Sequence, residues 1–244
     1  MVTLGSPRRL RGHTSNPQTG YSCAKICPME TSIVITGHNR VGKTTLALLL
    51  LDNLVRQKGL NVFYLPFGSG LRQELIDSGF TKSYLDSKTP AARRLLRAFG
   101  DARREAEGSD YYANVWLREA REAKSNFGSR DVIYIADDVY HLIEAKAMLT
   151  MPGLQKAYFV GVNRPGFDPN EEAMLYDSVK ETRLLMGCFS KANLKTRSKI
   201  HKVVGSSGNI PPLKTLFVEN VYNNTEEYID YLEEYVLPKF LNNF

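Results

Sequence analysis

The sequence predicts an α/β fold with three layers, in which a mainly parallel, five-stranded sheet lies between helices. Two observations lead to this prediction. Short apolar runs rich in β-branched residues alternate along the chain with longer segments of helical periodicity. Such runs are typical of strands that a parallel sheet buries on both faces. The 244 residues, 43% of them hydrophobic, are also enough to bury one sizeable core.

The strands are expected where the short apolar runs occur. The first is the run SIVIT, which a Gly-bounded loop follows. A predicted helix or a long polar stretch separates each run from the next, as parallel pairing requires. The predicted strands are Ser32–Thr36, Asn61–Pro66, Asp131–Asp137, Ala157–Val162 and Thr215–Glu219.

The helices are expected where apolar residues recur with helical spacing. The segment TLALLLLDNLVRQ has both the length and the spacing, and Pro90 suits the first turn of a helix. Residues 163–214 form a polar, partly helical stretch that ends in a segment rich in Gly and Pro. The predicted helices are Thr45–Gln57, Arg72–Ser78, Pro90–Phe99, Asp110–Ser125, Leu142–Leu149 and Thr225–Phe240.

Residues 1–28 show no periodicity and are expected to form a disordered basic arm, with the folded domain over residues 29–244. The arm contributes four basic residues and no carboxylate to a chain with a net charge of +6. Basic arms can bind nucleic acid, but a solvated tail is the simpler interpretation, so nucleic acid is not the expected partner. Cys23 and Cys27 lack the spacing of a zinc site.

A membrane partner is also not expected. The longest purely aliphatic run is Leu46–Leu51, far short of the roughly 20 residues that a spanning helix needs. The first residues carry no apolar block of the kind found in secretory signals. Three cysteines are too few for a disulfide scaffold, which favours a reducing cytoplasm, or the host cytoplasm for a phage protein.

The segment Gly37–Thr44, GHNRVGKT, matches the phosphate-binding pattern G-x-x-x-x-G-K-[ST] between a predicted strand and helix. Its glycines allow successive backbone N–H groups to turn inward and, with the helix N-terminus, to bind phosphate. Lys43 would add a charge between the β- and γ-phosphates, and the Thr44 hydroxyl would coordinate Mg²⁺. We therefore expect ATP and Mg²⁺ as cofactors, with ATP held by Gly37, Asn39, Arg40, Val41, Gly42, Lys43, Thr44 and Thr45.

The apolar run DVIYIADD ends in Asp137 and Asp138. A carboxylate at the C-terminal end of a strand, beside a phosphate loop, can hold Mg²⁺ directly or through water. Asp137 is the expected metal ligand together with Thr44, although the sequence leaves open which of the two aspartates acts. Solvated acids in an ordinary turn are the alternative.

The arginines favour a kinase among the phosphate-loop proteins. A GTPase would be expected to carry an Asn-Lys-x-Asp motif, which this sequence lacks. Planar guanidinium groups pair bidentately with the phosphate of an acceptor substrate. Each arginine taken alone is more typical of a solvated helix surface, so we expect only one or two of them to act on a substrate. Five arginines fall within twelve residues: Arg93, Arg94, Arg97, Arg103 and Arg104.

The chain resembles the bacteriophage deoxynucleoside monophosphate kinase family, a branch of the P-loop nucleoside monophosphate kinases. The similarity extends from about Thr31 to Val236, and the sequence departs from the family pattern at Tyr140, where the family has Arg, and at Ile143, where it has Asn. Besides the phosphate loop, the similar segments are FGSGLRQEL (67–75), RRLLRAFGDARRE (93–105), SDYYANVWL (109–117), DDVYHLIEA (137–145), Arg164 and VENVYNNTEEYIDYL (218–232).

The resemblance implies a P-loop NTPase-type fold with acceptor-binding helices over about 67–125 and a lid over about 163–214. It implies transfer of the ATP γ-phosphoryl group to a (deoxy)nucleoside monophosphate, with Lys43, Arg164, Asp137 and Asp138 as catalytic residues. Tyr112 and Trp116 could stack on a base or could belong to the core. The implied acceptor-binding residues are Arg93, Arg94, Arg103, Arg104, Tyr112, Trp116 and Glu144.

Two alternatives remain open on the sequence. One is another small-molecule P-loop kinase, similar to dephospho-coenzyme A kinase. The other is a nucleic-acid-binding P-loop ATPase, which the arm and the cations between Lys180 and Lys202 would favour. A homodimer is also left open.

Overall fold

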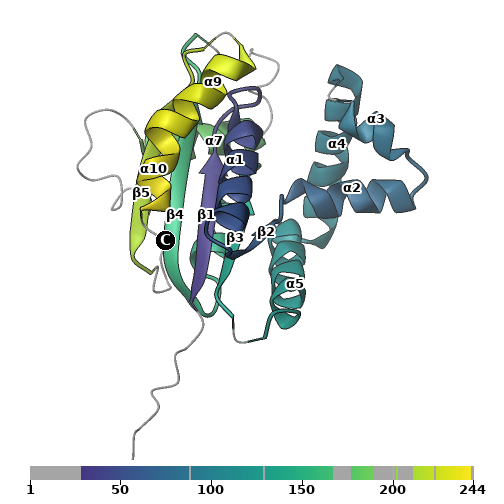
Figure 1. The fold of residues 1–244 in the computed structure, drawn as a ribbon. Helices are drawn as coiled ribbons and strands as arrows, with labels where there is room; N and C mark the ends of the chain where they lie inside the picture. Colours follow the sequence, from purple (N-terminus) through teal and green to yellow (C-terminus); the bar gives the residue numbers. More distant parts are fainter. Residues whose placement is uncertain are drawn as a thin grey trace, which may run out of the picture.

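The computed structural model describes residues 29–87, 89–128, 130–166, 177–189, 200, 202, 211–222 and 224–242. Within them five strands form one sheet in the order β2-β3-β1-β4-β5, and every neighbouring pair is parallel. The predicted α/β fold is confirmed (Figure 1). The strands are β1 Glu30–Thr36, β2 Asn61–Tyr64, β3 Val132–Ala136, β4 Leu154–Asn163 and β5 Leu213–Glu219.

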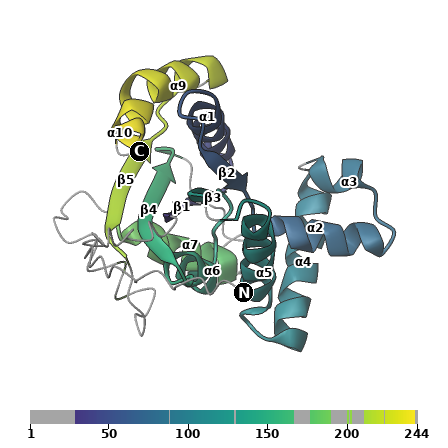
Figure 2. The same ribbon diagram turned by 60° about the horizontal axis from the view of Figure 1, so that its bottom comes forward.

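Helices cover both faces of this sheet (Figure 2). On one face, Ile33 and Ile35 of β1 pack with Leu46 of the helix that follows and with Tyr228 near the C-terminus. On the other face, Val34 packs in a second cluster of buried residues, to which helices later in the chain contribute. Because successive side chains of a strand point to opposite faces, a fully apolar β1 supplies both layers of the core. The result is the expected three-layer arrangement.

The helices follow the strands in the order that the sequence predicts. The closing helix is interrupted by one π-helical turn, Leu232–Val236. None of the helices in the described part of the chain has the length and hydropathy that crossing a bilayer requires. The helices are α1 Lys43–Arg56, α2 Gly68–Asp77, α3 Lys82–Asp86, α4 Pro90–Glu107, α5 Tyr111–Ser125, α6 Leu142–Leu149, α7 Asp177–Gly187, α9 Thr225–Tyr231 and α10 Leu237–Leu241.

The segment α2–α4 projects beside the sheet and has a small core of its own, with Leu71, Leu75, Leu85 and Tyr112 buried in it. Two expectations are wrong here. The short helix α3 was not predicted, and α4 continues to Glu107 instead of ending at Phe99.

Gly100 explains the longer helix. It is buried inside α4, where a Cβ atom would lie 2.7 Å from Leu71 Cδ1 of α2. Here glycine allows two helices to approach closely and does not end the helix. The amphipathic pattern of α4 continues beyond Gly100, and so does the helix.

The predicted arm, residues 1–28, lies outside the described residues, and so does much of the predicted lid. Within the described part of the predicted lid, α7 and the residues just after it pack on the sheet. Leu185 is fully buried, and Phe189 stacks on Phe159 of β4 with ring centroids 5.2 Å apart. Lid closure over residues 163–214 therefore stays a prediction, and α7 itself is anchored to the core.

Candidate functional site

One cavity of about 820 Å³ contains the phosphate loop and opens at the C-terminal ends of the strands. This volume is in the range of small-molecule sites, and the position is where open parallel sheets bind ligands. The cavity extends to both sides of the loop. Helices α2–α4 line one side, and the segment from Asn220 to Tyr228, after β5, lines the other. These walls follow β2 and β5, the two edge strands of the sheet.

The loop has the backbone geometry that its glycines predict. Gly37 and Gly42 have φ angles of 145° and 97°, and Arg40, with φ 64°, is also left-handed. A Cβ atom on Gly37 would lie 2.1 Å from the carbonyl oxygen of Val162, so no other residue fits there. Turns of mixed handedness orient consecutive N–H groups toward one point, which makes an anion-binding nest.

Two contacts hold the loop from behind. Val41 is fully buried, and the Asn220 side chain donates a hydrogen bond of 3.1 Å to the Val41 carbonyl. Tyr228 packs so closely that its ring would touch a Cβ on Gly42. The loop is therefore preorganised by residues near the end of the chain, and the sequence pattern does not reveal this support.

Lys43 folds back onto the loop. Its Nζ donates to the Gly37 and His38 carbonyls, each at 2.7 Å, and lies 4.9 Å from the centroid of the Tyr140 ring. Burial lowers the pKa of Lys43 to about 8, and Arg93 adds to this, although Asp137 and Asp138 oppose the shift. The ammonium group is therefore poised for a negatively charged ligand that would raise its pKa again.

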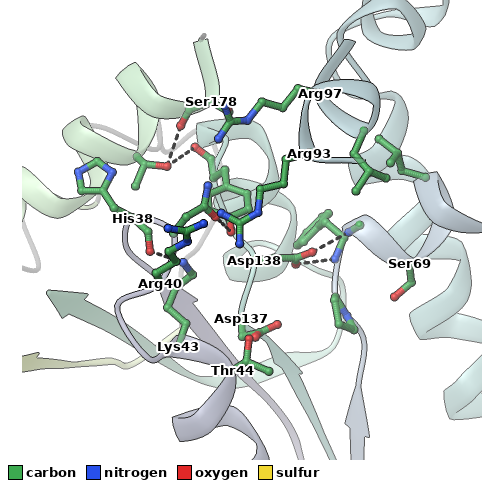
Figure 3. A pocket seen from close by; sticks show the side chains of 18 of the residues that line it. His38, Arg40, Lys43, Thr44, Ser69, Arg93, Arg97, Asp137, Asp138 and Ser178 are labelled. Atoms are coloured by element: carbon green, nitrogen blue, oxygen red, sulfur yellow. Dashed lines mark hydrogen bonds between the residues drawn. The ribbon is translucent and has the colours of Figure 1, made fainter. Parts of the chain in front are cut away.

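The two aspartates after β3 have different partners (Figure 3). Both oxygens of Asp138 accept backbone hydrogen bonds, from Phe67 N at 2.7 Å and Gly68 N at 2.8 Å. Asp137 accepts one bond of 2.8 Å from the Tyr64 hydroxyl. Burial and the neighbouring Asp137 raise the pKa of Asp138, partly offset by the two backbone donors. Asp138 thus attaches β3 to the start of α2, and Asp137 keeps an oxygen available.

The donor set suits a hard cation that also binds a ligand's phosphates. Thr44 and Asp137 both line the cavity and offer oxygen atoms. Mg²⁺ takes few ligands from the protein and completes its shell with water and phosphate oxygens. No group of three or more His, Cys, Asp or Glu side chains with metal-binding geometry occurs in the described ranges, so a dedicated all-protein cage is not found there.

Five of the arginines named from the sequence reach the cavity, and two do not. The lining ones are Arg40, Arg93, Arg97, Arg104 and, after β4, Arg164. Arg94 is exposed and not a lining residue, and Arg103 instead pairs with Glu74 at 2.9 Å. Successive side chains of a helix point in different directions, so some arginines of α4 face the cavity and others do not.

Arg93 lies in a group of like charges. Burial lowers its pKa, and the nearby guanidinium groups of Arg40 and Arg97 lower it further. No carboxylate contributes to this shift. A cluster of cations facing a cavity suits an anionic ligand. Figure 3 shows Arg93 and Arg97 extending from α4 toward Arg40 and the loop.

Glu144 and Tyr140 have local roles. One Glu144 oxygen accepts from the backbone N–H groups of Tyr140 and His141, each at 3.0 Å, as the capping box of α6. The other accepts from Arg104 at 3.2 Å. Tyr140 stands where the resembled family has Arg, and its hydroxyl donates to the Asn39 side chain at 2.8 Å. Glu144 therefore orients Arg104, and Tyr140 braces the loop.

The two aromatic candidates differ in position. Trp116 belongs to the core, stacked on Phe67 with centroids 5.3 Å apart and donating to the Leu65 carbonyl, and it does not line the cavity. Tyr112, one turn nearer the N-terminus of α5, does line it. Stacking of a substrate base on Trp116 is not supported, because no face of its ring is accessible.

Several lining residues were not predicted. Arg97 is not among them, because it is one of the five arginines singled out in the sequence, and it shares a helix face with Arg93 at i, i+4. Arg72 is the single arginine of α2 and carries no comparable signal. The segment after β5 supplies aromatic and polar side chains whose approach to the loop depends on the order of the strands. Among the unpredicted lining residues are Arg72, Asn220, Tyr222, Asn224, Thr225 and Tyr228.

The chain matches no protein-family model and no curated protein sequence. Among solved structures it matches a crystal structure described as "a putative kinase" from Chloroflexus aurantiacus J-10-fl. The identity is 16% and the TM-score 0.34, over 86% of this chain and 99% of the other. At these values the likeness supports no conclusion about what this protein binds or does.

Proposed function

We propose that the protein is an ATP-dependent kinase that transfers the γ-phosphoryl group of ATP to a (deoxy)nucleoside monophosphate, giving the diphosphate. The observation that carries the proposal is one continuous cavity that extends from the phosphate loop to both sides. One nucleotide would occupy the part beside Tyr222 and Asn224, which we call the donor arm of the cavity. A second would occupy the part between α2 and α4, which we call the acceptor arm of the cavity. The loop between the two arms is where their phosphates would meet.

The charges along the cavity support this assignment. Phosphoryl transfer is catalysed mainly by positioning and by stabilisation of negative charge. Lys43 and the loop amides would bind the β- and γ-phosphates, and Arg40, Arg93 and Arg97 would face the acceptor phosphate. Thr44 and Asp137 would hold Mg²⁺, which supplies further charge neutralisation when bound.

A kinase with another phosphorylated acceptor is the second candidate. It is favoured by Tyr140, which occupies the position of an arginine in the resembled family, and by Ile143, which packs against the core. Of these two departures, Tyr140 lines the cavity and Ile143 does not. A panel of all nucleoside monophosphates, deoxy and ribo, with dephospho-coenzyme A included, tests the proposal directly. Diphosphate formed from a monophosphate supports it, and turnover of dephospho-coenzyme A alone would favour the second candidate.

Binding of ATP should weaken as the pH rises through about 8. Above this pH the free protein loses the charge of Lys43, so ATP must bind together with a proton, and affinity should fall toward about tenfold per pH unit. Affinity for Mg²⁺–ATP measured by calorimetry from about pH 8 to about 9.5 checks this. Lys43→Arg is the matched control, because arginine stays charged and keeps the same acidic neighbours. Equal slopes for the two proteins would contradict the prediction.

Arg164→Ala should lower kcat by about tenfold and change the KM for ATP much less. Arg164 directly follows β4 and lines the cavity, so it starts from a rigid strand and can reach the transferring group. A contact made mainly in the transition state affects kcat. Steady-state kinetics on Arg164→Ala and on the control Arg183→Ala, an exposed arginine of α7, make the comparison. A rise in the KM for ATP without a fall in kcat would show a ground-state contact.

A further inference from the structure

The acceptor arm of the cavity contains buried polar atoms without hydrogen-bond partners. Among the described residues, six buried side-chain atoms lack a partner, and three of these belong to residues that line the cavity: Arg72 Nε, Tyr112 Oη and Tyr228 Oη. Arg72 and Tyr112 lie on the side of helices α2–α5. Leaving such atoms unpaired is costly, so the concentration of them at one site suggests groups that a ligand satisfies.

Tyr112 is the better defined of the two. The residue is 2% exposed, and its hydroxyl oxygen has no partner. Arg104 lies over the ring, with Cζ 5.2 Å from the centroid, and is itself held by Glu144 at 3.2 Å. Arg104 covers one face of the ring and the whole side chain is buried, so stacking on the ring is not supported, and the unpaired hydroxyl is the group left to recognise a ligand.

Arg72 adds a second donor to the same arm. Arg72 forms an ion pair with Asp86, in which Nε lies 3.7 Å from Oδ1, and at that distance Nε itself has no hydrogen bond. Leu71, Leu85 and Leu96 give this side of the cavity an apolar part, next to charged lining residues such as Asp86 and Asp101. Apolar walls with a few directed polar atoms suit a planar heterocycle, whose faces are apolar and whose edge forms hydrogen bonds.

The position along α4 separates this region from the phosphate site. Arg93 is close enough to Lys43 to lower its pKa, whereas Arg104 lies eleven residues further on, about 16 Å along the helix axis. Resting on the proposed function, we infer that Tyr112 Oη and Arg72 Nε form the subsite that hydrogen-bonds the edge of the acceptor's base. Base recognition here occurs through the hydroxyl of Tyr112 and not through stacking on its ring.

The test compares two neighbouring tyrosines. Tyr112→Phe removes a hydroxyl with no partner in the free protein, and Tyr111→Phe removes one that donates to Glu74 at 2.8 Å outside the cavity. Tyr112→Phe should keep or raise the Tm and lower kcat/KM for the best nucleoside monophosphate by about tenfold. Its activity toward deoxyribose 5-phosphate, which has the phosphate and no base, should not change. Tyr111→Phe should lower the Tm and leave both acceptors' kcat/KM values unchanged.

Three results would overturn the inference while leaving the kinase proposal intact. They are an unchanged kcat/KM for the nucleotide in Tyr112→Phe, an equal loss for both acceptors, and a fall in Tm that accompanies the loss of activity. A wild-type protein that phosphorylates no nucleoside monophosphate would instead overturn the proposed function, and this subsite with it.

Discussion

Lys43→Ala should reduce kcat/KM for phosphoryl transfer by about a thousandfold or more, while the protein stays folded. The ammonium group is the one buried charge inside the phosphate loop itself, and it follows the negative charge that moves during transfer. Loss of such a contact costs several kcal/mol in the transition state. The measurement is steady-state kinetics with Mg²⁺–ATP and the best acceptor.

A stability measurement must accompany this variant. In the free protein Lys43 donates to the carbonyls of Gly37 and His38, and their loss should cost about 1–2 kcal/mol of unfolding free energy. The matched control is Lys58→Ala, an exposed lysine beyond the end of α1, which should leave both activity and stability unchanged. Near-normal turnover by a folded Lys43→Ala protein would contradict the role of the loop in catalysis.

Arg93→Ala should lower kcat/KM for the acceptor by about a hundredfold, whereas Arg94→Ala should have almost no effect. The two residues are neighbours on α4, yet Arg93 lines the cavity and Arg94 is exposed. Charge-assisted hydrogen bonds from arginine to phosphate are worth about 1.5–3 kcal/mol, which corresponds to the expected loss. Kinetics with varied acceptor at saturating ATP measure it.

Stability should respond in the opposite sense to catalysis at this position. Arg93 is surrounded by Arg40 and Arg97, so its removal relieves repulsion in the free protein. Thermal unfolding of Arg93→Ala should therefore show an unchanged or higher Tm. Arg93→Lys should recover part of the activity, because it keeps the charge and loses the bidentate geometry. Equal kinetic losses in Arg93→Ala and Arg94→Ala would show that α4 acts only through its overall charge.

The two predictions differ in how far the sequence could support them. The role of Lys43 follows from eight consecutive residues, since every group of the phosphate loop is close in the chain as well as in space. Helical spacing could also group Arg93, Arg97 and Arg104 on one face of α4, four and seven residues apart. Helical spacing could not show that the face with Arg93, and not the face with Arg94, lines the cavity.

Local patterns by themselves determined the order of strands and helices, the parallel sheet and the position of the phosphate loop. These features depend on periodicity and on residues a few positions apart. The same reasoning predicted that α4 ends at Phe99, just before Gly100. In the sequence, a glycine that packs against Leu71 cannot be distinguished from one that ends a helix.

Only the tertiary structure decided which side chains share the cavity. The strand order β2-β3-β1-β4-β5 brings Asn220 and Tyr228, near the end of the chain, against the loop that follows β1. Asp137 and Asp138 both line the cavity, and the tertiary structure also gave them different partners: both oxygens of Asp138 accept hydrogen bonds from the start of α2, whereas Asp137 accepts one from Tyr64. Pairings of this kind join residues tens to hundreds of positions apart, and they form only when burial of both sheet faces selects one packing among many.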